Sequence, residues 1–173
     1  MKPGRVQRFD YEYKREGTSN LLVAFEPLTG FRIIEVSKQR TAADYTRFMQ
    51  RVAEHYGSAK KIRLVQDNLN THTSGSFYGS LNAEEAFALG QRFEMHYTPK
   101  KASWLNMAEI EINAVVRQGL KGRRIGSIDG MIEVIEPLVK ERNNNKTTVT
   151  WQFTPEKARV KLRRHYDRVV SKN

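Results

Sequence analysis

Two acidic residues, Asp67 and Glu109, stand where they could hold a metal ion. Asp67 lies between the apolar run Ile62–Val65 and a cluster of Asn, Thr and Ser side chains. Carboxylate oxygens, in a chain that has no cysteine, suit Mg²⁺ or Mn²⁺ much better than zinc. The alternative is structural, because an Asp followed by an Asn after a strand often forms an Asx-turn. The metal site is favoured only if a second carboxylate lies on a neighbouring element.

That second carboxylate is expected on the predicted helix after Ser103, which carries both Glu109 and Glu111. At about 100° per residue, Glu109 falls roughly 60° from the centre of the apolar face, and Glu111 roughly 100° from it on the other side. A carboxylate at the margin of a buried face can reach the end of a sheet without being enclosed, so Glu109 is the expected ligand. Asn106 shares its flank and could orient it. The alternative is that Glu109 meets only solvent or a nearby lysine. The apolar face comprises Leu105, Ala108, Ile112, Val115, Val116 and Gly119.

The basic composition indicates a polyanionic partner. The 173 residues, enough for one domain with a core, contain 30 Lys and Arg against 19 Asp and Glu, a net charge of +11. Such a balance is typical of nucleic-acid-binding proteins. In that setting, carboxylates with Mg²⁺ suggest phosphodiester chemistry, in which one ion activates water or a 3′-hydroxyl and another stabilises the leaving oxygen. No apolar run reaches transmembrane length, and the opening residues do not resemble a signal peptide.

Strands and helices alternate along the chain after a polar first segment, residues 1–19, which we interpret as a basic arm or the remnant of a hairpin. A hairpin followed by strand–helix alternation predicts an α/β fold with a mixed sheet flanked by helices. Sites in open α/β sheets form at the carboxyl ends of strands, and Asp67 occupies such an end. The predicted strands are 21–26 and 31–40, joined by the turn Pro27–Gly30, then 60–69 and 93–99; the predicted helices are 42–57, 81–91, 103–123, 127–145 with an interruption at Pro137, and 155–170.

Further polar residues could support these two acids or bind DNA. His72 could contact a scissile phosphate or a metal-bound water, or it could cap the turn after Asp67. Asn68 is expected to form the turn and could steady Asp67. Basic side chains surround the helix of Glu109 and recur at steps of four and three on the last helix; they suit phosphate contacts, or else a solvated face. The first group is Lys100, Lys101, Arg117, Lys121, Arg123 and Arg124; the second is Lys157, Lys161, Arg164 and Arg168.

Two motifs resemble a known family. The residues DNLNTH, 67–72, are similar to the Asp-Asn-x-x-x-His signature that follows the second catalytic strand of DDE-type transposases. The stretch 97–111 resembles that family's Pro-x-x-Ser-x-x-Leu-Asn-x-x-Glu segment: Pro99, Leu105, Asn106 and Glu109 match at that spacing, and Ser103 follows the position of the pattern's Ser by one residue. The resemblance is to the bacterial insertion-sequence branch of the mariner superfamily. It implies a ribonuclease-H-like fold and DNA cutting and joining by three acids with Mg²⁺ or Mn²⁺. Asp67 would be the second acid and Glu109 the third.

The resemblance departs from the family pattern at the first acid. In the family that Asp lies on a strand upstream of the segment matching Lys2-Pro3-Gly4, and Asp10, Glu26 and Asp44 do not align with it. We therefore expect residues 20–173 to form the catalytic domain without its first strand, and to cleave DNA poorly or not at all alone. The implied partners are the element's terminal repeats, target DNA, and the upstream half of the transposase or a second copy, in the bacterial cytoplasm at the nucleoid and not at a membrane.

Two alternatives remain open. A non-catalytic DNA-binding remnant, or an inhibitor of the intact transposase, would keep the basic surface and the fold while losing the chemistry. A general ribonuclease-H-like nuclease would need the first acid within the chain.

Overall fold

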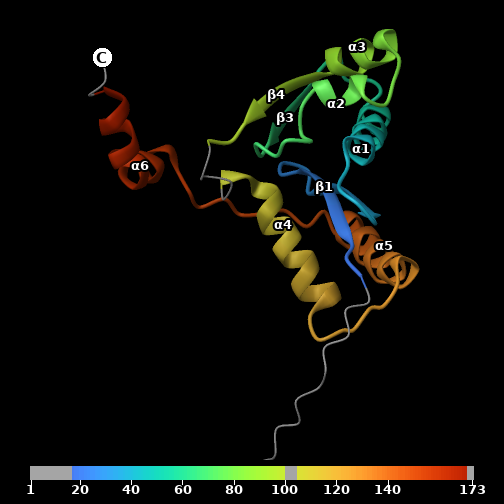
Figure 1. The fold of residues 1–173 in the computed structure, drawn as a ribbon. Helices are drawn as coiled ribbons and strands as arrows, with labels where there is room; N and C mark the ends of the chain where they lie inside the picture. The colour runs from blue at the N-terminus through green and yellow to red at the C-terminus, as the bar shows by residue number, and fades with distance from the viewer. Residues whose placement is uncertain (1–16, 100–104, 171–173) are drawn as a thin grey trace, which may run out of the picture.

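Two small sheets and the helices around them form a mixed α/β structure (Figure 1). The computed structural model describes residues 17–99 and 105–170, so the expected arm at residues 1–19 lies almost wholly outside the described part. The predicted strands are confirmed, and all but the first are shorter than predicted: β1 is Asn20–Glu26, β2 is Phe31–Ser37, β3 is Ile62–Gln66 and β4 is Phe93–Tyr97.

Strands β1 and β2 form the predicted antiparallel hairpin, with Asn20 opposite Ser37 and Glu26 opposite Phe31. The turn between them closes at Gly30, whose φ of 74° is in the left-handed region that favours glycine. A Cβ there would also come within 2.7 Å of the carbonyl oxygen of Lys146. The turn therefore has two separate reasons to contain glycine at this position.

Helix α1, Ala42–His55, begins where the sequence predicts, because Thr41 and Asp44 form a capping box. The Thr41 hydroxyl accepts from the Asp44 N–H at 3.1 Å, and the Asp44 carboxylate accepts from the Thr41 N–H at 3.0 Å. Buried side chains of α1 pack on one face of the hairpin and under β3 and β4. This first core cluster includes Leu22, Ile33, Tyr45, Phe48, Met49, Val52, Phe77, Leu89 and Phe93.

Strands β3 and β4 form a parallel pair, from Ile62 opposite Phe93 to Gln66 opposite Tyr97. Two helices connect them: α2, Gly75–Tyr78, and α3, Ala83–Gln91. The Asn82 side chain caps α3, accepting from the Glu85 N–H at 2.9 Å. The sequence does not predict helix α2, since its segment has the composition of a polar turn. Its Phe77, with no exposed surface, fixes this loop to the core.

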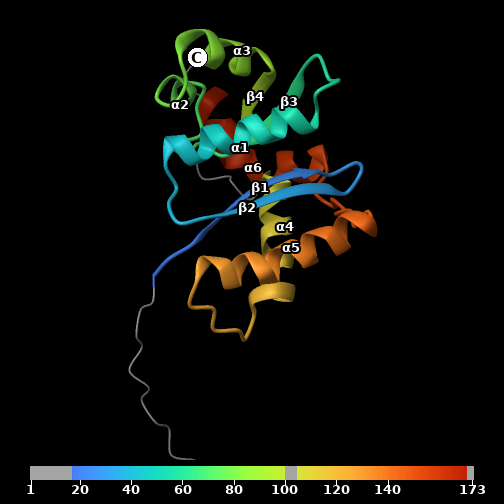
Figure 2. The ribbon, with the colours of Figure 1, turned by 90° about the vertical axis from the view of Figure 1, so that its right-hand side faces the viewer.

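Helices α4, Met107–Val115, and α5, Ile128–Asn144, cover the second face of the hairpin (Figure 2). A π-helical turn, Val116–Leu120, extends α4. The predicted interruption of α5 at Pro137 is wrong, because the helix continues through it. The carbonyl left without a donor belongs to Glu133, which is exposed, so water can satisfy it.

The prediction of one mixed sheet is not met within the described residues. The hairpin and the parallel pair are separate two-stranded sheets. The described part is therefore mixed α/β as predicted, but its strands do not form one continuous sheet. Helix α6, Pro155–Val170, stands apart from the two sheets after an extended segment (Figure 1). No helix in the described ranges is both long and apolar enough to cross a membrane.

Candidate active site

Asp67 follows the last residue of β3, and its carboxylate is held from one side. Oδ1 lies 2.6 Å from His72 Nδ1 and accepts a second, longer bond from the Leu69 N–H at 3.3 Å. The Leu69 bond is the Asx-turn that the sequence predicts as the structural alternative. Oδ2 makes no hydrogen bond to a residue in the described part, and 42% of the side chain is exposed. Turn formation therefore occupies one oxygen and leaves the other open.

His72 lies against Asp67 because the loop that carries it is itself fixed. Its backbone carbonyl accepts from Gln66 Nε2 at 3.0 Å, and its ring stacks on Tyr45 with centroids 4.9 Å apart. Only 19% of the His72 side chain is exposed. An ionised carboxylate can only accept, so this contact suits the form of the imidazole in which Nδ1 carries the proton. Of the two roles considered for His72, the structure thus gives it a direct contact with Asp67 within the turn.

The ends of β3 and β4 are tied together beside Asp67. The Thr98 N–H donates to the Gln66 carbonyl at 2.9 Å, which extends the parallel pairing by one residue. The Asn68 amide donates to the Thr98 carbonyl. Asn68 is therefore more than a turn residue, since it fixes the strand end from which Asp67 projects.

Glu109 lies in the first turn of α4 and is half-buried. The helix begins later than expected: Asn106 has non-helical backbone angles, and its side chain accepts from the Ala108 N–H at 3.0 Å. Asn106 is thus the N-cap, and it supports Glu109 by starting the helix there. Ser103, where the predicted helix begins, lies outside the described residues. The Glu109 side chain forms no hydrogen bond or ion pair with the residues described.

Glu111, two residues further along, is the buried acid of this helix. It has no exposed surface, and its carboxylate meets Arg32 Nε at 2.8 Å and Arg142 Nη2 at 2.8 Å. The predicted orientation, with Glu111 turned far from the buried face, is therefore wrong. The apolar pattern could not reveal this, because the two arginines come from β2 and α5. Val116, predicted on the buried face, is 39% exposed.

Burial of Glu111 bears on which acid could act as a ligand. Both carboxylate oxygens of Glu111 contact the guanidinium groups of Arg32 and Arg142. These buried cations need a negative charge beside them. Burial lowers the pKa of Arg32, the charge of Glu111 opposes that shift, and the charge of Arg142 adds to it. Glu109 has an uncommitted carboxylate on the same helix. Of the two, only Glu109 is available to a metal.

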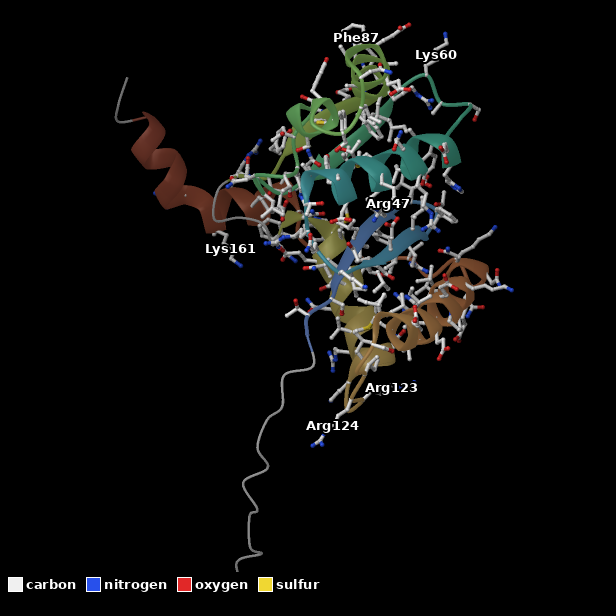
Figure 3. The ribbon with its side chains drawn as sticks, turned by 45° about the vertical axis from the view of Figure 1, so that its right-hand side comes forward. Arg47, Lys60, Phe87, Arg123, Arg124 and Lys161 are labelled. Atoms are coloured by element: carbon white, nitrogen blue, oxygen red, sulfur yellow. The ribbon has the colours of Figure 1, made fainter. Side chains whose placement is uncertain are left out.

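The first turn of α4 lies beside the ends of β3 and β4 (Figures 1 and 3). Asp67 and Glu109 together would offer two oxygen donors, the kind that Mg²⁺ and Mn²⁺ prefer. Within residues 17–99 and 105–170, no group of three or more His, Asp or Glu residues could hold a metal ion. The carboxylate oxygens of Asp67 and Glu109 are thus suitable donors for a hard divalent cation. A complete metal site needs at least one further donor.

The basic residues expected to bind DNA do not form one patch. Arg123 and Arg124 lie beyond the C-terminal end of α4, whereas Lys161 lies on α6 on the side of the β3 and β4 ends (Figure 3). Lys157 donates to the Gln152 carbonyl at 3.0 Å, and Lys161 lies 6.0 Å from the ring centre of Phe153. Arg117 and Lys121 are exposed near Arg123 in the sequence. Lys100 and Lys101 lie outside the described residues, as do the side chains of Arg164 and Arg168.

Sequence reasoning missed Gln66 and Tyr45 as neighbours of the site. The helical pattern predicts Tyr45 only as a core residue of α1. Gln66 offered one signal, a polar side chain in an otherwise apolar strand directly before Asp67, and its 6% exposure makes that signal meaningful.

Comparison with known proteins gives one match. A family model described as DDE superfamily endonuclease matches residues 1–132, which include β1 to β4 and α1 to α4 with both Asp67 and Glu109. No curated protein and no solved structure gives a significant match.

Proposed function

The chain belongs to the DDE superfamily of endonucleases, and we propose that it carries part of the catalytic domain of a transposase that cuts and joins DNA. In this proposal Asp67 and Glu109 are two of the three acids. The main support is that both carboxylates have an oxygen without a hydrogen-bond partner in the described part. Asp67, after the last residue of β3, has no partner at Oδ2, and Glu109, in the first turn of α4, has none at either oxygen. Their order in the chain, and their positions after a strand and in the first turn of a helix, support this proposal.

A ribonuclease-H-like sheet is the fold we propose for the complete domain. Parallel strands occur almost only in larger sheets that are covered on both faces, and two-stranded sheets have little stability of their own. Here β3 pairs only with β4, and β1 only with β2, among the described residues. One further strand, contributed from outside the described residues, would join the two sheets. We propose that it also supplies the first acid.

A divalent cation, when bound, would supply a Lewis acid that lowers the pKa of an attacking water and stabilises the leaving oxygen. The residues of this chain would do the remaining work. Asp67 and Glu109 would hold the cation, His72 would keep the Asp67 carboxylate turned outward, and Asn68 would keep the ends of β3 and β4 together. Glu111 would take no direct part, since it meets two buried arginines.

DNA is the substrate that this family implies, and the net charge of +11 supports it. We propose that the substrate is the end of a bacterial insertion sequence and that the protein acts at the nucleoid, because both sequence motifs resemble that branch. The competing function is a non-catalytic DNA-binding remnant or inhibitor. It is favoured by a single observation, the lack of a third acid near Asp67 in the described part.

A nicking assay tests the proposal. The purified chain would be incubated with Mg²⁺ or Mn²⁺ and the DNA that borders its gene, alone or together with the product of the sequence upstream. We expect cleavage only in the combined reaction, and its loss in the variants Asp67→Asn and Glu109→Gln. Robust cleavage by the chain alone, unchanged by Asp67→Asn, would refute the assigned acids. DNA binding without cleavage in every combination would leave the binding remnant as the better account.

A further inference from the structure

We propose that Tyr45 and Gln66 are positioning residues for Asp67, and that they act through His72. This inference rests on the proposed role of Asp67 as a metal ligand. The residues concerned are in contact with one another. Tyr45, on the buried face of α1, contacts Gln66, the last residue of β3, and both contact His72, which in turn contacts Asp67.

The first step is the orientation of the Gln66 amide. Its Oε1 accepts from the Tyr45 hydroxyl at 2.8 Å, and its Nε2 donates to the His72 carbonyl at 3.0 Å. Because one end of the amide is held as an acceptor and the other as a donor, it has a single satisfactory orientation. The His72 backbone is thereby fixed five residues beyond Asp67 in the chain.

The second step is the His72 ring. Tyr45 stacks on it at 4.9 Å with an interplanar angle of 25°, so the same tyrosine touches both the backbone anchor and the ring of His72. Tyr45 also stacks on Phe77, with ring centroids 5.9 Å apart, and this contact joins it to the core. The ring of His72 is therefore held in place when its Nδ1 meets Asp67 Oδ1 at 2.6 Å.

The polarity of this set argues against a purely structural role. Tyr45 is 4% exposed and Gln66 is 6% exposed, and an apolar pair of the same size would fill that space without the cost of desolvating polar groups. Burial raises the pKa of Tyr45, and the charge of Asp67 also raises it, so the phenol remains a hydrogen-bond donor at any pH where the protein works. The buried bonds lead outward to one half-exposed carboxylate. Hydrogen bonds to a metal-ligating side chain, made through atoms that do not bind the metal, set the orientation of that ligand.

We expect the loss of these contacts to change the orientation of the Asp67 carboxylate and not the affinity of the protein for DNA. With Oδ1 held by His72, Oδ2 is the oxygen presented to a cation. If Gln66 or Tyr45 is replaced, His72 gains freedom and the Asp67 carboxylate can rotate. We expect the rate of the chemical step to fall while the apparent affinity for DNA stays the same, because neither residue is exposed enough to touch DNA.

Three variants separate this role from general stability. Gln66→Leu removes both bonds of the amide, and Tyr45→Phe removes only the hydroxyl while keeping the ring stacked on His72. Tyr56→Phe is the matched control, because Tyr56 lies at the end of the same helix and its hydroxyl donates to Glu26 at 2.9 Å, away from Asp67. It makes the same chemical change and also removes one hydrogen bond.

The first measurement is the nitrogen NMR spectrum of the His72 ring, which reports which nitrogen carries the proton when the ring is neutral. We expect Nδ1–H in the wild type and in Tyr56→Phe, and a shift toward the Nε2–H form of free histidine in Gln66→Leu and Tyr45→Phe. The second is Mn²⁺ binding, which we expect to weaken about 10-fold in those two variants, as happens when groups that orient a metal ligand are removed. Unchanged His72 spectra and Mn²⁺ affinity in both, or equal changes in Tyr56→Phe, would overturn the inference.

The same measurements keep this inference apart from the proposed function. If Mn²⁺ does not bind at Asp67 in any variant, the proposed metal site fails, while the His72 spectra still decide whether Tyr45 and Gln66 position the ring. If the combined cleavage reaction proceeds at wild-type rate and DNA affinity in Gln66→Leu and Tyr45→Phe, the positioning role fails and the metal site stands.

Discussion

Glu111 Oε2 lies 2.8 Å from Arg142 Nη2 in the interior, and this ion pair fixes how α4 faces the rest of the fold. Arg142 also donates to Gln118 at 2.9 Å, and Arg32 meets Glu111 from β2. The helix therefore cannot rotate about its axis without separating buried charges, which is strongly unfavourable. Because Glu109 is on the same helix, its half-exposed position is set by the burial of Glu111.

Glu111→Gln should destabilise the protein severely, because it leaves two buried arginines without an anion. We expect a loss of about 3–5 kcal/mol in the free energy of unfolding, as for other broken buried ion pairs, measured by urea denaturation. Glu109→Gln is the matched control on the same helix and should change stability by less than about 0.5 kcal/mol. Equal effects of the two substitutions would contradict the separate roles given to these acids.

Asn143→Ala should release the outer edge of β2 from α5. The Asn143 side chain accepts from the Arg32 N–H and donates to the Arg32 carbonyl, each at 2.9 Å, as a neighbouring strand would. Leaving both groups unpaired should cost about 1–3 kcal/mol. The exposed neighbour Asn144 provides the control, with an expected change within about 0.5 kcal/mol. Hydrogen exchange at the Arg32 amide should accelerate only in Asn143→Ala; a protected amide there would argue against the contact.

Asp44 should make the stability of the protein fall in acid. Hydrogen bonds from the Thr41 side chain and then its backbone hold the pKa of Asp44 below its ordinary value. A group with a lowered folded-state pKa stabilises fully above its unfolded value, about 3.9, and that contribution disappears as the pH falls through the folded value. The stability difference between wild type and Asp44→Asn should therefore be largest near neutral pH and shrink below about pH 4. A difference that is constant from pH 7 to pH 2 would show that the charge is unimportant.

The basic residues of α6 should contribute more to DNA binding near the site than those beyond α4. Replacing Lys157, Lys161, Arg164 and Arg168 with Gln should weaken binding and flatten its salt dependence, by about 0.9 in log–log slope for each phosphate that is no longer neutralised. The matched variant changes the same number of charges at Arg117, Lys121, Arg123 and Arg124, all of which follow the last residue of α4 in the chain. Arg123 and Arg124 lie beyond the C-terminal end of that helix (Figure 3). Salt-dependent binding curves of both variants decide the matter. An unchanged slope for the α6 variant would refute its role.

Features specified by neighbouring residues could be predicted from the sequence. The hairpin turn depends on Gly30, the start of α1 on Thr41 and Asp44, and the start of α3 on Asn82, and each signal lies within a few residues of the element it sets. The position of Asp67 at a strand end followed from the same kind of pattern.

Features that depend on distant partners could not be predicted. Glu111 is polar, so its burial becomes visible only when Arg32 and Arg142 are in place. Helix α2 is too short to show periodicity, and the contact of Gln66 with Tyr45 joins residues on different elements. The division of the strands into two sheets depends on pairing between strands, which single-strand patterns do not specify.

Asp67 and Glu109 are proposed to hold the same divalent cation, and paramagnetic broadening by Mn²⁺ tests that shared site. Amide NMR signals of the chain would be recorded during titration with Mn²⁺, for the wild type, Asp67→Asn, Glu109→Gln and the control Tyr56→Phe, whose tyrosine is partly buried. We predict broadening centred on both the loop after β3 and the first turn of α4, abolished in either acid variant and kept in Tyr56→Phe. Broadening confined to one of these two segments, or persisting in Asp67→Asn, would contradict the shared site.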